Sequence, residues 1–404
     1  MTTALALADV TPMLDRPDPG RTEPAVRARA VAPVINGAGP VIEANKALPP
    51  EVLEAMHGAR LFRTLLPQAY GGDQTTPAAF YRMMEIIAAA DGSTGWCLCQ
   101  ASGCSIASAY MAPEVAREIW GPANAVLAWG FGNGVARVVP GGYRVSGTWA
   151  FASGNRHATW MGGHCRVIEP DGSIRQNPDG SQHERSMLVP RHVPRFHDVW
   201  NVVGLRGTNS DTYTYDDVFV PEAYSVCRDS DAERRVEAPL YRFTTSHLYS
   251  AGFAGVSIGI ARGLLDAFTA LAKGKTAAAT TKPLRDSEVV QNGIAQAEAK
   301  LRSARAWLIE VLEEAHDLAE TTGRITMTER AMIRLATTSG IQRAKEVAEW
   351  AYHEAGASAI MQSGPFERRM RDIHASSQQV HGRSAHLEMC GQHFLGMNPS
   401  GRFF

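Results

Sequence analysis

The hydrophobic period changes twice along this chain, and that change limits the folds available to it. From about residue 48 to 123, apolar residues recur every three or four positions, as expected of helices. From about 124 to 227 they alternate, and a Gly141-Gly142 turn joins two strands into a hairpin. From about 239 onward the helical period returns. The order predicts an α+β protein with a β layer between two helical domains.

Four segments follow from these changes. Residues 1–40 mix Pro, Gly, Arg and Ala without a period and are predicted to be a poorly ordered lead-in. Residues 41–123 form an N-terminal helical domain, 124–235 a central β-sandwich or barrel, and 236–404 an up-down helical bundle. Within the bundle, apolar positions from Val290 to Val311 alternate steps of four and three. This seam suits either packing within the bundle or contact between subunits.

Composition excludes several partners. The formal net charge is -1 and no basic block is present, so nucleic acid is not expected as a partner. No apolar run approaches the roughly 20 residues that span a bilayer, and the first apolar stretch lacks a preceding positive region. Six cysteines are too few for a disulfide framework and lack zinc-like spacing, which predicts reduced, buried thiols and no metal site. A cytoplasmic location is expected.

Several segments together resemble the acyl-CoA dehydrogenase family over some 350 residues. They are LPPEVLEAMHGARLFRTLLPQAYGG, GLRGTNSDTYTYDDVFVPE, LRDSEVVQNGIAQAEAKLRSARAWL and RRMRDIHASSQQV. The resemblance implies a catalytic carboxylate about two and a half turns after Arg371-Asp372, at Val380, or else within residues 247–250. Neither place carries an acid. Because valine cannot accept a proton, simple α,β-dehydrogenation is disfavoured.

The segment GNGVARVVPGGYRVSGTWAFASGNRHATW is similar to the flavin monooxygenase branch of this fold. That branch comprises oxygenase components of two-component hydroxylases for phenols, steroid-derived catechols, amines and thiophenes. The resemblance implies reduced FMN or FAD from a separate flavin reductase, O2 as co-substrate and a homotetramer. No GxGxxG motif follows a strand, so a nicotinamide site of Rossmann type is not expected, which agrees with an outside source of electrons.

The resemblance also implies roles for individual residues. In this branch an aromatic-x-Ser-Gly turn places a serine hydroxyl near flavin N5, and here that turn is Phe151-Ala152-Ser153-Gly154. Period two puts Trp149 and Phe151 on the strand face of Ser153, where they form either apolar walls for the flavin or ordinary β core. The remaining expected contacts are Arg206 and Asn209 in the loop above the flavin, and Trp96, Gln100 and His247 around the substrate.

Each of these residues also has a plainer interpretation. Arg206 and Asn209 suit a turn, Trp96 and Gln100 suit helix packing, and His247 suits the cap of the first bundle helix.

One position departs from the branch. Many members carry His after Ser-Gln, whereas this chain has Gln379 there and His381 two residues later. Glutamine donates a hydrogen bond but does not shuttle a proton. Either Gln379 has a hydrogen-bonding role, or His381 takes the position. The expected catalytic residues are therefore Ser153, Gln379 and His381.

The leading hypothesis is a flavin-dependent monooxygenase that hydroxylates a small aromatic or related substrate. One alternative is an acyl-CoA oxidoreductase with a relocated base. Another, motivated by Gln379, is a flavin-binding protein without catalytic activity. A third is an oxygenase that acts on nitrogen or sulfur rather than on a ring carbon.

Overall fold

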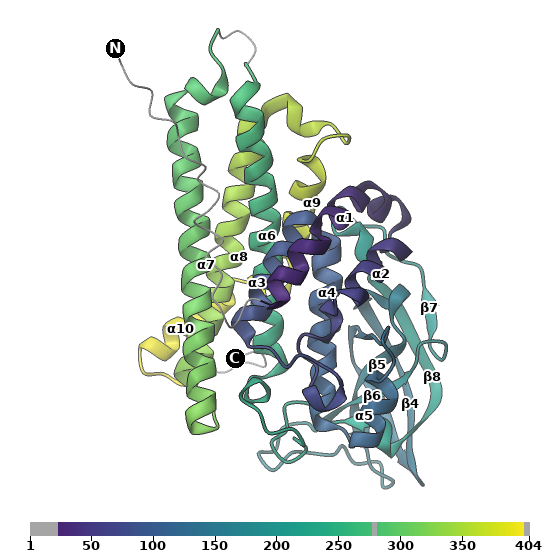
Figure 1. Ribbon diagram of the computed structural model, residues 1–404. Helices are drawn as coiled ribbons and strands as arrows, with labels where there is room; N and C mark the ends of the chain where they lie inside the picture. Colours follow the sequence, from purple (N-terminus) through teal and green to yellow (C-terminus); the bar gives the residue numbers. More distant parts are fainter. Residues whose placement is uncertain (1–22, 277–280, 400–404) are drawn as a thin grey trace.

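The computed structural model describes residues 23–276 and 281–399 of the chain. Long helices form a bundle on one side of the molecule, a β-sheet lies on the other, and the N-terminal helices pack between them (Figure 1). The predicted α–β–α order is therefore present. The sheet and the bundle face each other across the N-terminal helices.

The N-terminal region contains five α-helices within the described residues. Thr76 caps the third of them, because its hydroxyl accepts a hydrogen bond from Ala79 N at 3.3 Å. Asp91 caps the fourth, with its carboxylate 2.8 Å from Thr94 N. Thr76 and the proline that follows it therefore mark the start of the third helix. The bounds are α1 (Glu23–Asn45), α2 (Pro50–Gly58), α3 (Pro77–Ala90), α4 (Gly92–Ser105) and α5 (Pro113–Trp120).

Helix α1 corrects the predicted lead-in from residue 23 onward. Its buried residues recur at helical spacing and pack in the core that includes α3; they are Ala28, Val31, Ile35, Ala38 and Ile42. Pro33 and Pro40 lie inside the helix and hid this period, because an interior proline costs about 3 kcal/mol. Burial of the apolar face offsets that cost. The rest of the predicted lead-in, residues 1–22, lies outside the described residues.

The strands of the described chain form one nine-stranded mixed sheet, in the region where the sequence predicted a β-sandwich or barrel. Its order is β7-β8-β4-β3-β5-β6-β9, with β1 paired to β5 and β2 to β4. The predicted hairpin is confirmed: β3 and β4 are antiparallel, and Gly141 takes a φ of 80° in their turn. The bounds are β1 (Leu127–Trp129), β2 (Phe131–Gly132), β3 (Gly134–Val139), β4 (Gly142–Ala152), β5 (Trp160–Ile168), β6 (Glu184–Pro190), β7 (Arg195–His197), β8 (Asp211–Pro221) and β9 (Ser225–Val226).

The alternation along β4 stops before the strand ends. Tyr143, Val145 and Trp149 alternate along the strand and are buried, but Phe151 is 63% exposed. Its φ is 61°, and the pairing with β8 shifts register between Trp149 and Ala152. Such a β-bulge turns a side chain away from the face that the alternation assigns to it. Trp149 and Phe151 therefore do not share an environment, contrary to prediction.

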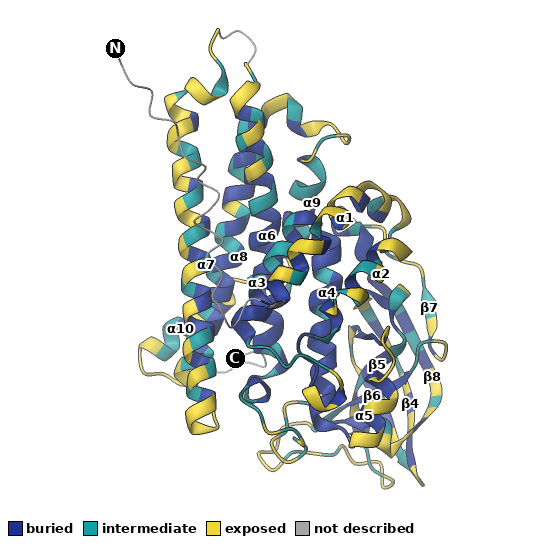
Figure 2. Cartoon of the chain, in the orientation of Figure 1, coloured by how far each residue is buried: buried dark blue, intermediate teal, exposed yellow. Residues whose placement is uncertain are grey.

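The C-terminal bundle is built around α6, whose middle is buried against α3 and α8 (Figure 2). This helix is long and apolar enough to cross a membrane, but 61% of its most apolar window is buried within the protein, as in a core helix. Helix α7 packs on α8, and its four-three seam is buried there apart from the partly buried Ile294. The bounds are α6 (Thr245–Gly274), α7 (Glu288–Thr322), α8 (Met327–Ala355), α9 (Glu367–Ser377) and α10 (Ala385–Phe394).

Candidate active site

A cavity of about 980 Å³ lies between the sheet and the helices. Its volume is in the upper part of the range of small-molecule and cofactor sites. Aromatic rings and a few polar groups line it, which is the usual composition of such sites. The sequence-predicted residues that line it are Trp96, Gln100, Phe151, Ser153, Gln379 and His381.

A chain of hydroxyl groups lies at the end of β4. Ser153 Oγ is 2.6 Å from Ser210 Oγ, which in turn is 2.7 Å from Thr208 Oγ1. Trp96 on α4 donates its indole N–H to Ser153 Oγ at 3.0 Å. Because the indole can only donate, Ser153 accepts from Trp96. Thr208 Oγ1 donates to the Leu205 carbonyl at 2.8 Å, so it accepts from Ser210, and Ser210 accepts the proton of Ser153. The structure thus places Ser153, a predicted flavin contact, in a hydrogen bond with Trp96, a predicted substrate contact.

A second polar group connects α4 with α6. Gln100 donates its side-chain N–H to Tyr249 Oη at 3.2 Å and to the Trp129 carbonyl at 3.3 Å. Tyr249 donates back to the Gln100 carbonyl at 3.2 Å. Burial raises the pKa of Tyr249 well above its ordinary value, so the phenol stays neutral.

Tyr249 and Phe253, four residues apart on α6, are site residues that were not predicted from the sequence. Both line the cavity, and their rings stack at 5.6 Å. Their spacing of four residues on one helix was the available signal, because residues four apart share a helix face.

Two exposed phenylalanines flank the cavity on the sheet side. Phe131 on β2 is 67% exposed and Phe151 on β4 is 63% exposed. Phe151 makes an edge contact with Trp200 at 6.1 Å between ring centroids. Large apolar side chains left uncovered around a cavity usually mark a binding surface, and aromatic faces favour a planar ligand. The residues therefore fit a flavin ring or an aromatic substrate.

The helical side of the cavity carries Gln379 and His381, the two residues that the sequence offered for the position usually held by histidine. The turn η11 (Val380–Gly382) follows α9, and Gln379 caps it by accepting a hydrogen bond from His381 N at 2.7 Å. His381 is 3% exposed and lies 2.5 Å from the guanidinium of Arg334 through Nδ1. Burial, followed by the charge of Arg334, lowers the pKa of His381 well below its ordinary value. The Gln379 oxygen thus has a structural task, and both Gln379 and His381 belong to the cavity lining.

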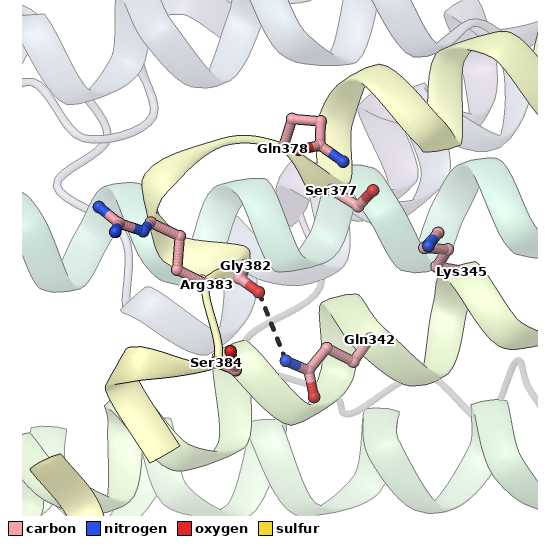
Figure 3. A pocket seen from close by; sticks show the side chains of 7 residues that line it. All are labelled: Gln342, Lys345, Ser377, Gln378, Gly382, Arg383 and Ser384. Carbon is pink, nitrogen blue, oxygen red and sulfur yellow. Dashed lines mark hydrogen bonds between the residues drawn. The ribbon is translucent and has the colours of Figure 1, made fainter. Parts of the chain in front are cut away.

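A smaller pocket of about 290 Å³ lies against the same turn (Figure 3). Gln342 on α8 donates to the Gly382 carbonyl there at 3.4 Å. Gln378 and Arg383 line both this pocket and the main cavity. The turn that carries His381 therefore separates two pockets and is held to α8 from behind.

For Trp149 and His247 the structure agrees with the plainer of the two roles considered from the sequence. Trp149 is fully buried in the sheet, where it stacks on Tyr213 at 5.4 Å and donates to the His164 carbonyl at 3.0 Å. His247 shares a capping box with Thr244 at the start of α6. Burial lowers the pKa of His247 to about 3. Neither side chain lines the cavity, so Trp149 is a core residue and His247 a helix cap.

Gly154, Arg206 and Asn209 also lie outside the cavity lining. Gly154 has a φ of 76° and donates its N–H to the Thr208 carbonyl at 3.0 Å. Asn209 is buried, also has positive φ, and donates to Asp211 within its own loop. All three shape the loops beside Ser153, which agrees with the plainer alternative for Arg206 and Asn209.

The loop from Val202 to Leu205 is fixed to α9. Leu205 lines the cavity, and its backbone N–H donates to Asp372 Oδ1 at 2.6 Å. Glu43 on α1 pairs with both Arg206 and Arg371, at 3.1 and 2.6 Å. Burial raises the pKa of Asp372 to about 7. The Arg371-Asp372 pair of the sequence motif thus anchors a cavity loop.

Charged groups also line the cavity. The guanidinium of Arg228 lies over the Trp129 ring at 5.1 Å. Two carboxylates, Glu184 and Asp229, belong to the lining. Asp229 accepts hydrogen bonds from the backbone and hydroxyl of Thr245, both at 2.8 Å, and so caps α6. Val380, where the resemblance placed the base of a dehydrogenase, also lines the cavity.

Comparison with known proteins agrees with this geometry. Residues 251–382 match the family described as acyl-CoA dehydrogenase, C-terminal domain. The chain is 30% identical to indole-3-acetate monooxygenase of Pseudomonas putida over 86% of its own length and 87% of that protein. The chain belongs to the flavin-dependent monooxygenases built on the acyl-CoA dehydrogenase fold.

Further comparisons match this chain along nearly the whole length of the matched proteins. The oxygenase subunit HsaA, a flavin-dependent monooxygenase of Rhodococcus jostii, is 30% identical over 86% of this chain and 92% of its own. The crystal structure of 3-HSA hydroxylase from Rhodococcus sp. RHA1 superposes with a TM-score of 0.86 at 26% identity. It covers 95% of this chain and 99% of its own. The family predicted from the sequence is therefore confirmed.

Proposed function

We propose that the cavity between the sheet and the bundle binds reduced flavin together with a small aromatic substrate, and that a separate reductase provides the flavin. Reduced flavin, when bound, supplies the electrons that activate O2 for hydroxylation of the substrate. Phe131, Phe151 and Trp200 provide the apolar faces on which a planar ring system lies. Support comes from the size of the cavity, its exposed aromatic rings and the family of the chain.

In this proposal Ser153 and His381 are the polar contacts of the flavin and of the oxygen. Ser153 accepts from Trp96 and donates its own proton to Ser210, which leaves an oxygen lone pair for a donor on the ligand. His381 faces the same cavity from the helical side. The loop that Asp372 holds over the cavity excludes water, which protects reactive oxygen chemistry from side reactions.

The substrate occupies the part of the cavity around Gln100, Tyr249 and Phe253. Their aromatic faces and hydrogen-bonding groups suit a ring that carries a hydroxyl or ring nitrogen. An aromatic substrate is favoured because indole-3-acetate monooxygenase resembles this chain over most of its length. These contacts apply equally to FMN and FAD, because both carry the same isoalloxazine ring.

We further propose a cytoplasmic homotetramer. All six cysteines are free, and five of them are buried, as in proteins of a reducing compartment. Tetramers are the usual assembly of the fold that the chain resembles. Light scattering on a sizing column tests the assembly, and a monomeric mass would contradict it.

The observation that carries the proposal is the hydroxyl of Ser153 beside exposed aromatic rings in one cavity. The test is rapid mixing of the protein, loaded with reduced FMN or FAD, with oxygenated buffer. An absorbance band that persists before oxidised flavin returns, followed by a hydroxylated aromatic product, is the expected result. Immediate return of oxidised flavin, without product from any aromatic compound, would contradict the proposal. Bleaching of bound FAD by an acyl-CoA would indicate a dehydrogenase instead.

A further inference from the structure

Arg334 lies behind the wall of the cavity and is fully buried on α8. Its guanidinium contacts two residues of the cavity lining: His381 Nδ1 at 2.5 Å and Ser246 Oγ at 3.0 Å. Burial of a guanidinium is costly, and its desolvation lowers the pKa of Arg334 to about 10. The contacts of this buried cation with the cavity lining must offset the cost of its burial, which suggests that they have a specific function.

The chemistry of the contact settles the tautomer of His381. A guanidinium has N–H donors and no acceptor, so Nδ1 of His381 must accept. A neutral imidazole carries a single N–H, which is then on Nε2. Protonating Nδ1 as well would set an N–H of the imidazolium against an N–H of Arg334.

The backbone of His381 is held as firmly as its ring. Its N–H donates to Gln379 Oε1 at 2.7 Å, and its carbonyl accepts from Thr338 Oγ1 at 2.8 Å. Gln342, one turn further along α8, donates to the Gly382 carbonyl at 3.4 Å (Figure 3). Helix α8 therefore fixes the turn from behind while the ring lines the cavity.

The other titratable groups that face His381 also lower its pKa. His386 on α10 lies 6.4 Å away between ring centroids and donates through Nε2 to the Val380 carbonyl at 2.9 Å. His247 faces it from α6. Burial, Arg334, His386 and His247 all lower the pKa of His381. The ring is therefore neutral throughout the physiological range.

We propose that Arg334 is a positioning residue that fixes His381 as a neutral imidazole with its N–H on Nε2. His381 then acts as a constant hydrogen-bond donor toward an acceptor in the cavity, and it does not carry protons. The acceptor belongs to the flavin, the oxygen or the substrate, so this role rests on the proposed function. Gln379 supports it by holding the backbone N–H of the same residue.

The first test is histidine NMR of the flavin-free protein labelled with ¹⁵N-histidine. His381 is assigned by the resonances that disappear in His381→Gln. We expect the Nε2–H tautomer from pH 6 to pH 8 without titration. A Nδ1–H tautomer, or an imidazolium within that range, would overturn the inference. Because no flavin and no turnover are needed, this result is independent of the proposed function.

The second test replaces the arginine. Arg334→Met removes both donors, so His381 is expected to populate both tautomers, and product per reduced flavin consumed should fall roughly 10-fold, as expected for one lost hydrogen bond. Arg334→Lys retains one donor and should recover the Nε2–H tautomer and part of the yield. Arg343→Gln on the same helix, whose guanidinium contacts Ser303 at 3.3 Å, is the matched control and should change neither.

An unchanged tautomer in a folded Arg334→Met protein would overturn the positioning role. If that variant does not fold, the tautomer of the unmodified protein decides the question by itself. A normal tautomer response in a protein that yields no product would contradict the proposed function and leave the role of Arg334 intact.

Discussion

The two sides of the cavity are built in different ways. On the sheet side, Phe151 and Ser153 come from the end of one strand, and a local bulge turns them toward the ligand space. On the helical side, His381 lies on a short turn whose orientation depends on Arg334, Thr338 and Gln379. One side is thus shaped mainly by a few consecutive residues, and the other by contacts from a separate long helix.

The sheet side therefore determines mainly the shape of the cavity, and the helical side determines mainly its hydrogen bonding. The bulge leaves large aromatic rings uncovered, which suits binding of a planar molecule. The buried contacts around His381 fix a tautomer, which suits a defined hydrogen bond. Substitutions on the two sides are therefore expected to have different consequences.

The largest expected effect concerns two residues of the same strand. Trp149→Ala empties a fully buried site between the strands and should lower the free energy of unfolding by about 3–5 kcal/mol. Phe151→Ala, two residues later, removes an exposed ring and should cost less than about 1 kcal/mol while weakening flavin binding. Urea unfolding and flavin titration measure the two quantities. Equal losses of stability would show that the bulge does not separate core from cavity.

A smaller effect is expected from Asp372, which anchors the cavity loop from α9. Its folded pKa of about 7 exceeds the unfolded value of about 4, so the folded state keeps a proton that the unfolded state has released. This contribution to stability is complete below the unfolded pKa and is lost as the pH rises through 7. Between pH 6 and pH 8 the loss should be about 1–2 kcal/mol.

Asp372→Asn keeps an oxygen for Leu205 N–H but has no proton to lose. Its stability should therefore change less between pH 6 and pH 8 than that of the unmodified protein. Urea unfolding at the two pH values measures the difference. The same pH dependence in both proteins would assign the titration to another group.

The smallest effect is expected from the hydroxyl chain of the sheet side. Ser153→Ala removes the acceptor of Trp96 and should lower stability by about 1 kcal/mol. It should also lower product per reduced flavin by roughly 5–10-fold, as expected for one lost hydrogen bond. Ser210→Ala leaves the Trp96–Ser153 bond in place and is the matched comparison. If both variants give the same yield as the unmodified protein, Ser153 has no direct role at the flavin.

The sequence predicted much of the fold because its signals were local. The alternation along the strands and the Gly141-Gly142 turn depend on neighbouring residues, and the β3–β4 hairpin bears them out. Helix α1 was missed because its two prolines are unfavourable by local propensity, and only packing in the core offsets them. The face of Phe151 was missed because a bulge ends the alternation.

The sequence by itself determined the family, the α–β–α order and the position of Ser153 directly after β4. Only the tertiary structure decided that Trp149 is core, that His247 is a cap and that His381 faces the cavity. The physical reason lies in the distance of the deciding contacts along the chain. Arg334 is 47 residues from His381, and no local pattern predicts which buried donor meets which ring nitrogen.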